Sequence, residues 1–244
     1  MRLYYDLHIH SALSPCGDDD MTPNNIVNMS LINELDVIAL SDHNTCQNLK
    51  VTAQLAKEAG LVFLPGVEVE TAEEIHVLCL FSDVESALNF ENEVLVKALP
   101  DIPNNESIFG KQQIMDINDN VIATESRFLI NATTLDIDTI GKVVEGFGGV
   151  AVPAHIDKST KSIISMLGMV DKSMGFNTFE LSKNAPDDYT DTQFSLKDQN
   201  YSYIYNTDAH YLQDIAERGQ RNFFELEPPV TPQKIITLIK EGQF

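Results

Sequence analysis

The chain has 244 residues, enough for one domain or two, and 43% of them are hydrophobic, which is typical of a globular protein and excludes a disordered chain. The formal net charge is −21. We therefore expect the surface to repel phosphodiester backbones, which argues against long nucleic acid as a partner, although a local basic site could still hold one strand end.

No apolar run approaches the roughly 20 residues that a membrane-spanning helix needs, so we expect no membrane partner. His8 and His10 interrupt the first apolar stretch, and we predict no signal peptide. The three cysteines, Cys16, Cys46 and Cys79, are an odd number without the spacing of a disulfide framework. This pattern favours a reducing compartment, and we expect a cytoplasmic protein.

Strand-like runs alternate with helix-like runs in the first part of the chain. Thr22 and Pro23 supply an N-cap and a first-turn proline for one helix, and Gly60 suits the position that follows another. The pattern predicts, in chain order, a strand at 3–10, a helix from 22 to about 35, a strand at 36–44, a helix at about 48–59, and strands at 61–71 and 75–81.

The same alternation continues in the second part. A helix is expected near 84–98, followed by an irregular stretch at 99–131 with a hairpin turn at Asn118–Asn120. Seven or eight strands mostly separated by helices predict an α/β protein with a largely parallel sheet closed into a (β/α) barrel, distorted or short of eight strands. The remaining elements are a helix at about 137–147, a strand at 148–156, a helix from about 160, strands at 177–182, 201–210 and 223–227, and a helix that begins at Thr231-Pro232.

All six histidines lie beside a carboxylate or at the end of a strand-like run. Taken alone, each motif has an ordinary explanation: two histidines one residue apart can form a solvated face, and a lone histidine such as His76 is usually a core residue. Their combination favours a metal site, and imidazole with carboxylate suits Zn²⁺, Mn²⁺ or Fe. In a barrel the chemistry lies at the carboxyl ends of the strands, where the motifs DLHIH, SDHN, PAHI and NTDAH are placed.

These motifs, together with GVEVET and IHVL, resemble those of the PHP (polymerase and histidinol phosphatase) domain of metal-dependent phosphoesterases. The resemblance covers nearly the whole chain outside residues 84–140. It implies a distorted (β/α)7 TIM-like barrel and a single PHP domain at 1–244 with a divergent insertion at about 84–140. It also implies a trinuclear metal site, in which two or three divalent cations (Zn, Mn or Fe) are bound.

The resemblance also implies a ligand set. Asp18 is the open assignment, because many relatives have a histidine there, and Asp20 or Cys16 could serve instead. Asp6 and Asp42 are expected to orient histidines by accepting their second ring N–H. The implied ligands are His8, His10, Glu68 and Asp208 for the first metal, Asp18, His43 and His210 for the second, and Glu68, His76 and His155 for the third, with Glu68 bridging.

The implied reaction is attack on phosphorus by a metal-activated hydroxide. Lys158 and Lys183, each just past a strand, are candidates to offset charge on the phosphate, and Arg218 and Arg127 are weaker ones. The residues expected to take part directly in catalysis are Glu68, Asp208, His210 and Lys158.

The expected substrate is a small phosphomonoester, and the expected partner is a small phosphorylated molecule without long nucleic acid. One alternative is a nuclease or a cyclic-nucleotide or oligonucleotide phosphodiesterase. Another is a metal-binding PHP module without catalysis, although a complete ligand set argues against it. An amidohydrolase barrel is the rival fold; the bridging candidate Glu68 and the Asp208-x-His210 motif fit PHP better.

Overall fold

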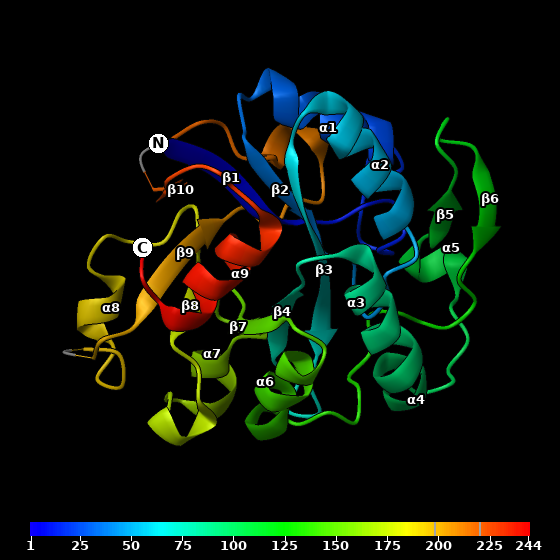
Figure 1. Ribbon diagram of the computed structural model, residues 1–244. Coiled ribbons are helices and arrows are strands. Elements are labelled where there is room, and N and C mark those ends of the chain that lie inside the picture. The colour runs from blue at the N-terminus through cyan, green and yellow to red at the C-terminus, as the bar shows by residue number, and fades with distance from the viewer. Residues whose placement is uncertain (198, 220) are drawn as a thin grey trace.

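The computed structural model describes residues 1–197, 199–219 and 221–244. Its main element is a curved sheet with strand order β10-β1-β2-β3-β4-β7 (Figure 1). β1, β2 and β3 run parallel, β4 runs antiparallel to both β3 and β7, and β10 runs antiparallel to β1. These strands are β1 (Arg2–Ile9), β2 (Val37–Leu40), β3 (Val62–Glu70), β4 (His76–Leu80), β7 (Val150–Pro153) and β10 (Phe223–Glu225).

The expected largely parallel sheet is therefore wrong at β4. Its register pairs Glu70 with His76 across a tight turn. A parallel neighbour would need a crossover of a dozen or more residues, and the five residues between these two strands permit only a hairpin. The reversal puts the first residue of β4 beside the last residue of β3.

A second, parallel pair consists of β8 (Thr178–Ser182) and β9 (Ser202–Asn206). This pair contacts the curved sheet at two places. After β7, the N–H of Ile156 donates to the carbonyl of Glu180 in β8, and at the end of β1, Ile9 forms a bridge with Ala209, which follows β9. In the described residues no strand ladder joins the pair to the larger sheet. The fold is thus mixed α/β with a curled, half-barrel sheet.

The helices agree closely with their sequence signals. The Thr22 side chain accepts the N–H of Asn25 at the start of α1, and Gly60 ends α2 with φ of 80°. The stretch predicted as one helix at 84–98 is helical throughout, with a π-helical middle. The helices are α1 (Pro23–Ile32), α2 (Leu49–Ala59), α3 (Val84–Phe90), η1 (Glu91–Leu95), α4 (Val96–Ala98), α5 (Glu106–Phe109), α6 (Ile137–Gly146), α7 (Ile163–Leu167), η2 (Lys172–Met174), α8 (Tyr189–Thr192), η3 (Leu212–Asp214) and α9 (Pro232–Glu241).

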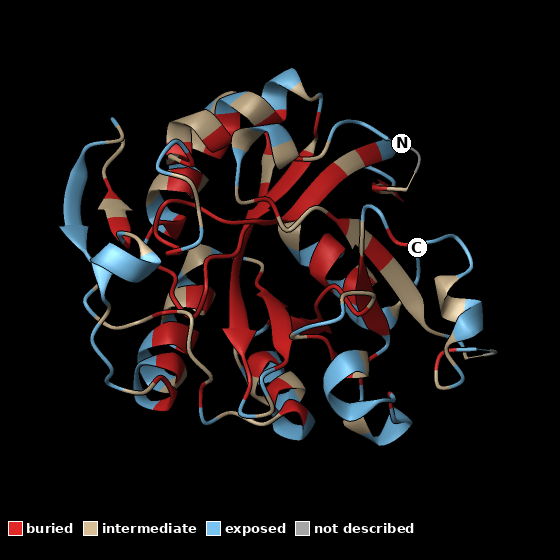
Figure 2. Cartoon of the chain, turned by 180° about the vertical axis from the view of Figure 1, so that it is seen from behind, coloured by how far each residue is buried: buried red, intermediate tan, exposed pale blue. Residues whose placement is uncertain are grey.

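Both faces of the sheet are buried, whereas the outer sides of the helices are exposed (Figure 2). Along β2, Val37 and Ala39 join one apolar cluster, which contains the isoleucines of α9. Ile38 and Leu40 point to the opposite face and join the cluster that contains α1, α2, α3 and α6. No described helix is long and apolar enough to cross a membrane.

Residues 113–124 form a small arm beside this body. β5 (Gln113–Met115) and β6 (Val121–Thr124) make a hairpin whose turn contains the predicted Asn118–Asn120 segment. Asp119 in that turn accepts hydrogen bonds from the Thr22 hydroxyl and from Asn24 at the start of α1. The arm is therefore attached to the loop that follows β1.

Candidate metal centre

Glu68 lies at the middle of the histidine cluster. Its carboxylate is fully buried at the end of β3. Oε1 lies 3.2 Å from Nε2 of His8, 3.0 Å from Nδ1 of His76 and 3.2 Å from Nε2 of His155. Oε2 lies 3.1 Å from Nδ1 of His43 and 3.4 Å from Nε2 of His10.

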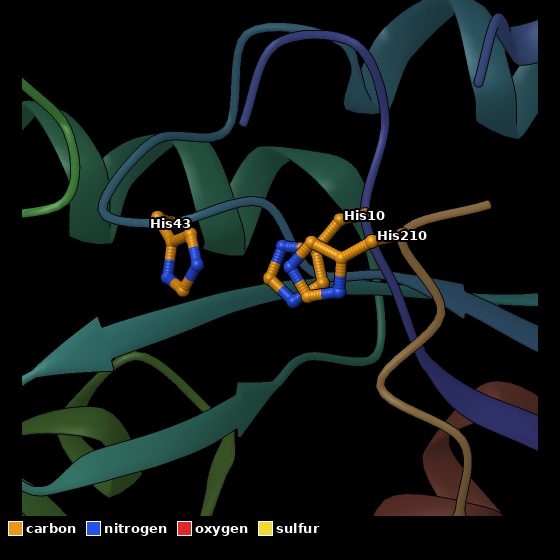
Figure 3. A group of neighbouring side chains, drawn as sticks. All are labelled: His10, His43 and His210. Atoms are coloured by element: carbon orange, nitrogen blue, oxygen red, sulfur yellow. The ribbon is translucent and has the colours of Figure 1, made fainter. Parts of the chain in front are cut away.

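The sixth histidine joins through Asp208. Oδ1 of Asp208 lies 3.1 Å from Nε2 of His10 and 3.6 Å from Nδ1 of His210. The rings of His10 and His210 are stacked with centroids 4.3 Å apart, and His43 stands beside them, 4.6 Å from His10 (Figure 3). All six histidines of the chain therefore meet at one place.

The topology explains this convergence. His8 and His10 end β1, His43 follows β2 and His155 follows β7, all at the same edge of the sheet. His76 opens its strand, and it reaches this edge only because β4 is antiparallel. The backbones of His155 and Asp208 are left-handed, with φ of 32° and 55°, a strain of the kind that concentrates at functional sites.

The donor atoms suit a cation. Several donor and acceptor atoms of the cluster are buried and have no hydrogen-bond partner among the described residues: Nε2 of His8, Nε2 of His10, Nδ1 of His43, Oε2 of Glu68 and Oδ1 of Asp208. Burying such atoms unpaired is costly, and a bound cation removes that cost. Three groups each bring their ligand atoms within 4.8 Å of one another: His8, His10, Glu68 and Asp208; His10, His43 and His210; and His43, Glu68 and His76.

Charge within the cluster keeps the carboxylates ionised. Burial alone would raise the pKa of Glu68, but His76, His8 and His43 outweigh it and hold this pKa well below its usual range. Burial would also raise the pKa of Asp208, and His8 and His10 hold it well below its usual range. Both carboxylates are thus available as anionic ligands at neutral pH.

Sequence reasoning missed Glu180. This buried carboxylate on β8 lies 2.9 Å from Nδ1 of His8, and it accepts hydrogen bonds from the Asn206 side chain at 2.9 Å and from the backbone N–H of His155 at 3.0 Å. It orients His8 so that Nε2 faces Glu68. The available signal was a glutamate inside the apolar run TFEL, where a charge needs a buried partner.

Asp42 and Asp6 behave differently from expectation. Nδ1 of His10 lies 2.9 Å from the Ser14 hydroxyl, which donates to Asp42, so Asp42 acts on His10 only through Ser14. Asp6 has no imidazole ring among its described hydrogen-bond partners. It accepts from the Thr207 hydroxyl and the N–H of Ala216, and so holds the segments on either side of His210.

Asp18 lies beside the cluster without joining any of the three groups. Its carboxylate accepts the N–H of Asp20 at 2.9 Å, and its own N–H donates to the carbonyl of His210. Cys16 and Asp20 are both exposed. The choice of ligand in this loop stays a prediction.

Two of the predicted cations lie near the centre. Lys158 has its Nζ 2.5 Å from Oδ2 of Asp208, and 39% of its side chain is exposed, so it stands at the mouth of the site. Lys183 follows β8 and donates to the carbonyl of Asp214 at 3.1 Å. Sequence reasoning missed a third, Lys161, whose Nζ is 2.6 Å from Oε1 of Glu70.

The structure does not bring Arg218 or Arg127 to the cluster. The Arg218 guanidinium lies 4.2 Å from the ring centroid of Tyr4. Tyr4 precedes His8 by four residues of extended strand, about 13 Å. Arg127 pairs with Glu125 inside the insertion.

Comparison with known proteins shows the family to which this chain belongs. The profile of the PHP domain matches residues 6–185. The chain belongs to the PHP domain family, whose members are metal-dependent hydrolases of phosphoester bonds.

Its curated relatives match in part. A 5'-3' exoribonuclease of Haemophilus influenzae is 35% identical over 86 residues, 34% of this chain and 30% of the relative. An uncharacterized protein of Methanocaldococcus jannaschii is 34% identical over 98 residues, 36% of this chain and 57% of the relative. The matches thus span less than two thirds of either relative.

Solved structures with the same fold cover nearly the whole chain. A lesion-specific endonuclease from Pyrococcus furiosus has a TM-score of 0.67 at 20% identity, over 98% of this chain and 56% of its own. A putative metal-dependent phosphoesterase from Bifidobacterium adolescentis has a TM-score of 0.59 at 19% identity, over 97% of this chain and 96% of its own. At these identities the likeness shows the fold.

The expectation of a small phosphorylated partner without long nucleic acid is wrong. Endonuclease Q, which has this fold with a TM-score of 0.66 at 19% identity, holds a 27-mer duplex with an abasic lesion at its active site, and the Haemophilus relative is named an exoribonuclease. Net charge averages the whole surface, whereas a substrate meets only the local potential around the site. A charge of −21 therefore does not exclude nucleic acid.

Proposed function

We propose that this chain is a metal-dependent nuclease, which hydrolyses phosphodiester bonds of a nucleic acid. The observation that carries the proposal is the convergence of six histidines on Glu68 and Asp208 with buried ligand atoms unpaired. The nucleic-acid substrate is supported by the exoribonuclease relative from Haemophilus influenzae and by the endonucleases that have this fold. A phosphomonoester has no comparable support.

The centre would hold two or three divalent cations, with Zn²⁺, Mn²⁺ and Fe as the candidates for this donor set. Such cations supply a strong nucleophile from water near neutral pH and neutralise charge on the phosphate. The ligands would be His8, His10, Asp18, His43, Glu68, His76, His155, Asp208 and His210.

The chain's own residues would position the phosphate and balance its charge. Lys158 is the only one of the predicted cations that touches a ligand, and its half-exposed ammonium can leave Asp208 for a phosphate oxygen. Glu180 would keep the ring of His8 in one tautomer, with the proton on Nδ1. Buried Glu68 would remain ionised throughout, because the cations replace the histidine charges that lower its pKa.

We also propose that seven of these strands form the distorted barrel of the family, with β10 added antiparallel beside β1. The seven are β1, β2, β3, β4, β7, β8 and β9. The contacts of Ile156 with Glu180 and of Ile9 with Ala209 support closure at both sides. Residues 84–140 would then be an insertion within a single domain at 1–244.

The test is hydrolysis of end-labelled RNA and DNA oligonucleotides by purified protein, first stripped with chelator and then supplied with Mn²⁺ or Zn²⁺. His10→Ala serves as the inactive control, and p-nitrophenyl phosphate serves as the monoester arm. We expect shortened oligonucleotides that depend on metal and are absent with His10→Ala.

Release of phosphate from the monoester with intact oligonucleotides would make the chain a phosphatase and refute the nuclease. Bound metal without hydrolysis of any substrate would favour a module without catalysis. Substrates labelled at the 5' end or at the 3' end also show whether the enzyme removes nucleotides from a strand end or cuts within the strand.

A further inference from the structure

A cavity of about 390 Å³ lies beside the proposed metal centre. It is bounded by the carboxyl ends of β8 and β9 and by residues from 213–219 and 221–222, and its lining includes Lys183, Tyr205, Thr207, Gln213 and Arg221. Its size falls within the range of small-ligand sites.

The cavity shares a wall with the metal centre. Thr207 lines the cavity, and the next residue, Asp208, faces His10 at 3.1 Å. Asn206 also lines the cavity, and its side-chain amide donates to Glu180, which holds His8. A phosphate at the cations would therefore lie next to whatever occupies the cavity.

The charge of the cavity is opposite to that of the protein. Its charged lining consists of two cations, Lys183 and Arg221, and one carboxylate, Glu217, in a chain whose net charge is −21. Lys183 makes one side-chain hydrogen bond, to a carbonyl. Arg221 donates to the carbonyl of Ala185 at 2.9 Å, and it pairs with Asp187 at 3.4 Å, where the Asp187 side chain is 98% exposed and the pair correspondingly weak. A phosphate can therefore replace Asp187 while the bond to Ala185 holds the guanidinium in place. Both can bind a phosphate group.

Tyr205 and Arg221, which both line the cavity, form a surface on which a nucleobase can stack. The Arg221 guanidinium lies 4.1 Å from the ring centroid of Tyr205. Nucleobases stack on aromatic rings and on guanidinium planes. Gln213 adds an amide that can bond the edge of a base, since it has no side-chain hydrogen bond among the described residues.

We infer that this cavity binds one nucleotide of the substrate, the nucleotide adjacent to the bond that is cut. Its phosphate would lie on Lys183 and Arg221, and its base would stack on the face of the Arg221 guanidinium that is turned away from Tyr205. This inference rests on the proposed nuclease function. It defines the substrate as a strand whose nucleotide can leave the base stack and enter this cavity, which is a strand end or an unpaired stretch.

The test compares the metal-loaded enzyme with Arg221→Gln, Lys183→Gln and the control Arg2→Gln. Arg2 is a matched control, because it also lies over an aromatic ring, that of Phe223 at 4.4 Å, and pairs with a carboxylate, but outside the cavity. The substrates are a short oligonucleotide and bis(p-nitrophenyl) phosphate, a diester without nucleotides. AMP is used as a competitive inhibitor and as a ligand in calorimetry.

We expect Arg221→Gln and Lys183→Gln each to weaken AMP binding about tenfold and to lower kcat/KM for the oligonucleotide relative to the small diester by about the same factor. Arg2→Gln should change neither quantity. Because Lys183 makes a single exposed hydrogen bond, its variant tests the inference even where Arg221→Gln perturbs folding.

Equal AMP affinity and equal substrate ratios in wild type and both variants would overturn the inference while leaving a hydrolytic wild type as a nuclease. Failure of the wild type to hydrolyse either diester would refute the nuclease instead. AMP calorimetry would then still show whether the cavity binds a nucleotide.

Discussion

The two carboxylate oxygens of Glu180 lie 3.0 and 2.9 Å from Nδ1 of His8, and both side chains are fully buried. The residues are 172 positions apart in the chain. Glu180 receives two further donors, the Asn206 amide and the N–H of His155, so its oxygens meet donors only. This carboxylate fixes the direction of the first imidazole of the centre and the backbone of another.

Replacing Glu180 by Gln should weaken metal binding by about 10- to 100-fold, because the new NH₂ group would face one of these donors and His8 would lose its orientation. Isothermal titration of the metal-free variant with Zn²⁺ measures this change, and circular dichroism checks that the fold is kept. Wild-type affinity in a folded variant would refute the orienting role.

Metal affinity should decrease as the pH falls. Burial lowers the pKa of His76, but Glu68 and Glu70 outweigh it and raise this pKa to about 9, and the pKa of His8 is raised as well. An imidazole binds a cation only when neutral, so below about pH 9 the metal-free protein must release protons on binding. We expect affinity to fall about tenfold per pH unit for each proton released.

The measurement is calorimetry between about pH 6.5 and 9 in buffers of different ionisation enthalpy, which reports the protons directly. His76→Asn, with no titrating ring, should show a shallower slope. An affinity that is constant across this range would mean that the histidines are already neutral without metal.

Removal of metal should lower the melting temperature. Cations that bind only the folded chain stabilise it, by about 3–4 kcal/mol at 100 to 1,000 times the dissociation constant, which is about 5–15 °C for a domain of this size. Scanning calorimetry with and without chelator tests this, and restored Zn²⁺ should reverse it. An unchanged melting temperature would argue against tight binding at the cluster.

Glu91→Ala should destabilise the loop that carries His43. Oε1 of this buried residue in the π-helical turn accepts the Thr45 hydroxyl at 2.7 Å and the N–H of Cys46 at 2.9 Å. Leaving both donors unpaired costs about 1–3 kcal/mol each. Chemical denaturation measures the loss.

The exposed neighbour Glu93 lies in the same π-helical segment, and Glu93→Ala should be close to neutral. Glu91→Gln keeps an acceptor oxygen and should recover part of the stability. Equal effects of Glu91→Ala and Glu93→Ala would contradict a specific role for the buried carboxylate.

Local signals in the sequence were sufficient for most helix boundaries. Thr22 and Thr231 accept N–H groups at the starts of α1 and α9, and Gly60 ends α2 in the left-handed region, as their residue types predict. These contacts lie within a few residues along the chain, so they can be predicted without knowledge of the rest of the fold.

Strand direction and closure required long-range information. An apolar run such as IHVLCLF fits a parallel and an antiparallel strand equally well, so the pattern alone did not reveal that β4 reverses. The short connection between Glu70 and His76 did contain that information. The proposed closure of the barrel would depend on contacts such as Ile9 with Ala209, which no local pattern specifies.

The histidine cluster could be located from sequence because imidazoles are rare in this chain and each follows a strand or opens one. The residues that surround the cluster could not be predicted from the sequence. Glu180 resembles an ordinary strand glutamate until its partner His8 is known. Arg218 looked available for phosphate, but it stacks on Tyr4 at the other end of β1.

The side chains that meet at Glu68 and Asp208 extend from His8 to His210, so the first and last of them are separated by most of the chain. A chain still being synthesised, or one cut before Asp208, has five of the six histidines and lacks Asp208 and His210. Such a chain would have no complete centre. The proposed hydrolytic activity would thus begin only after the segments that carry His8 and His210 have folded together.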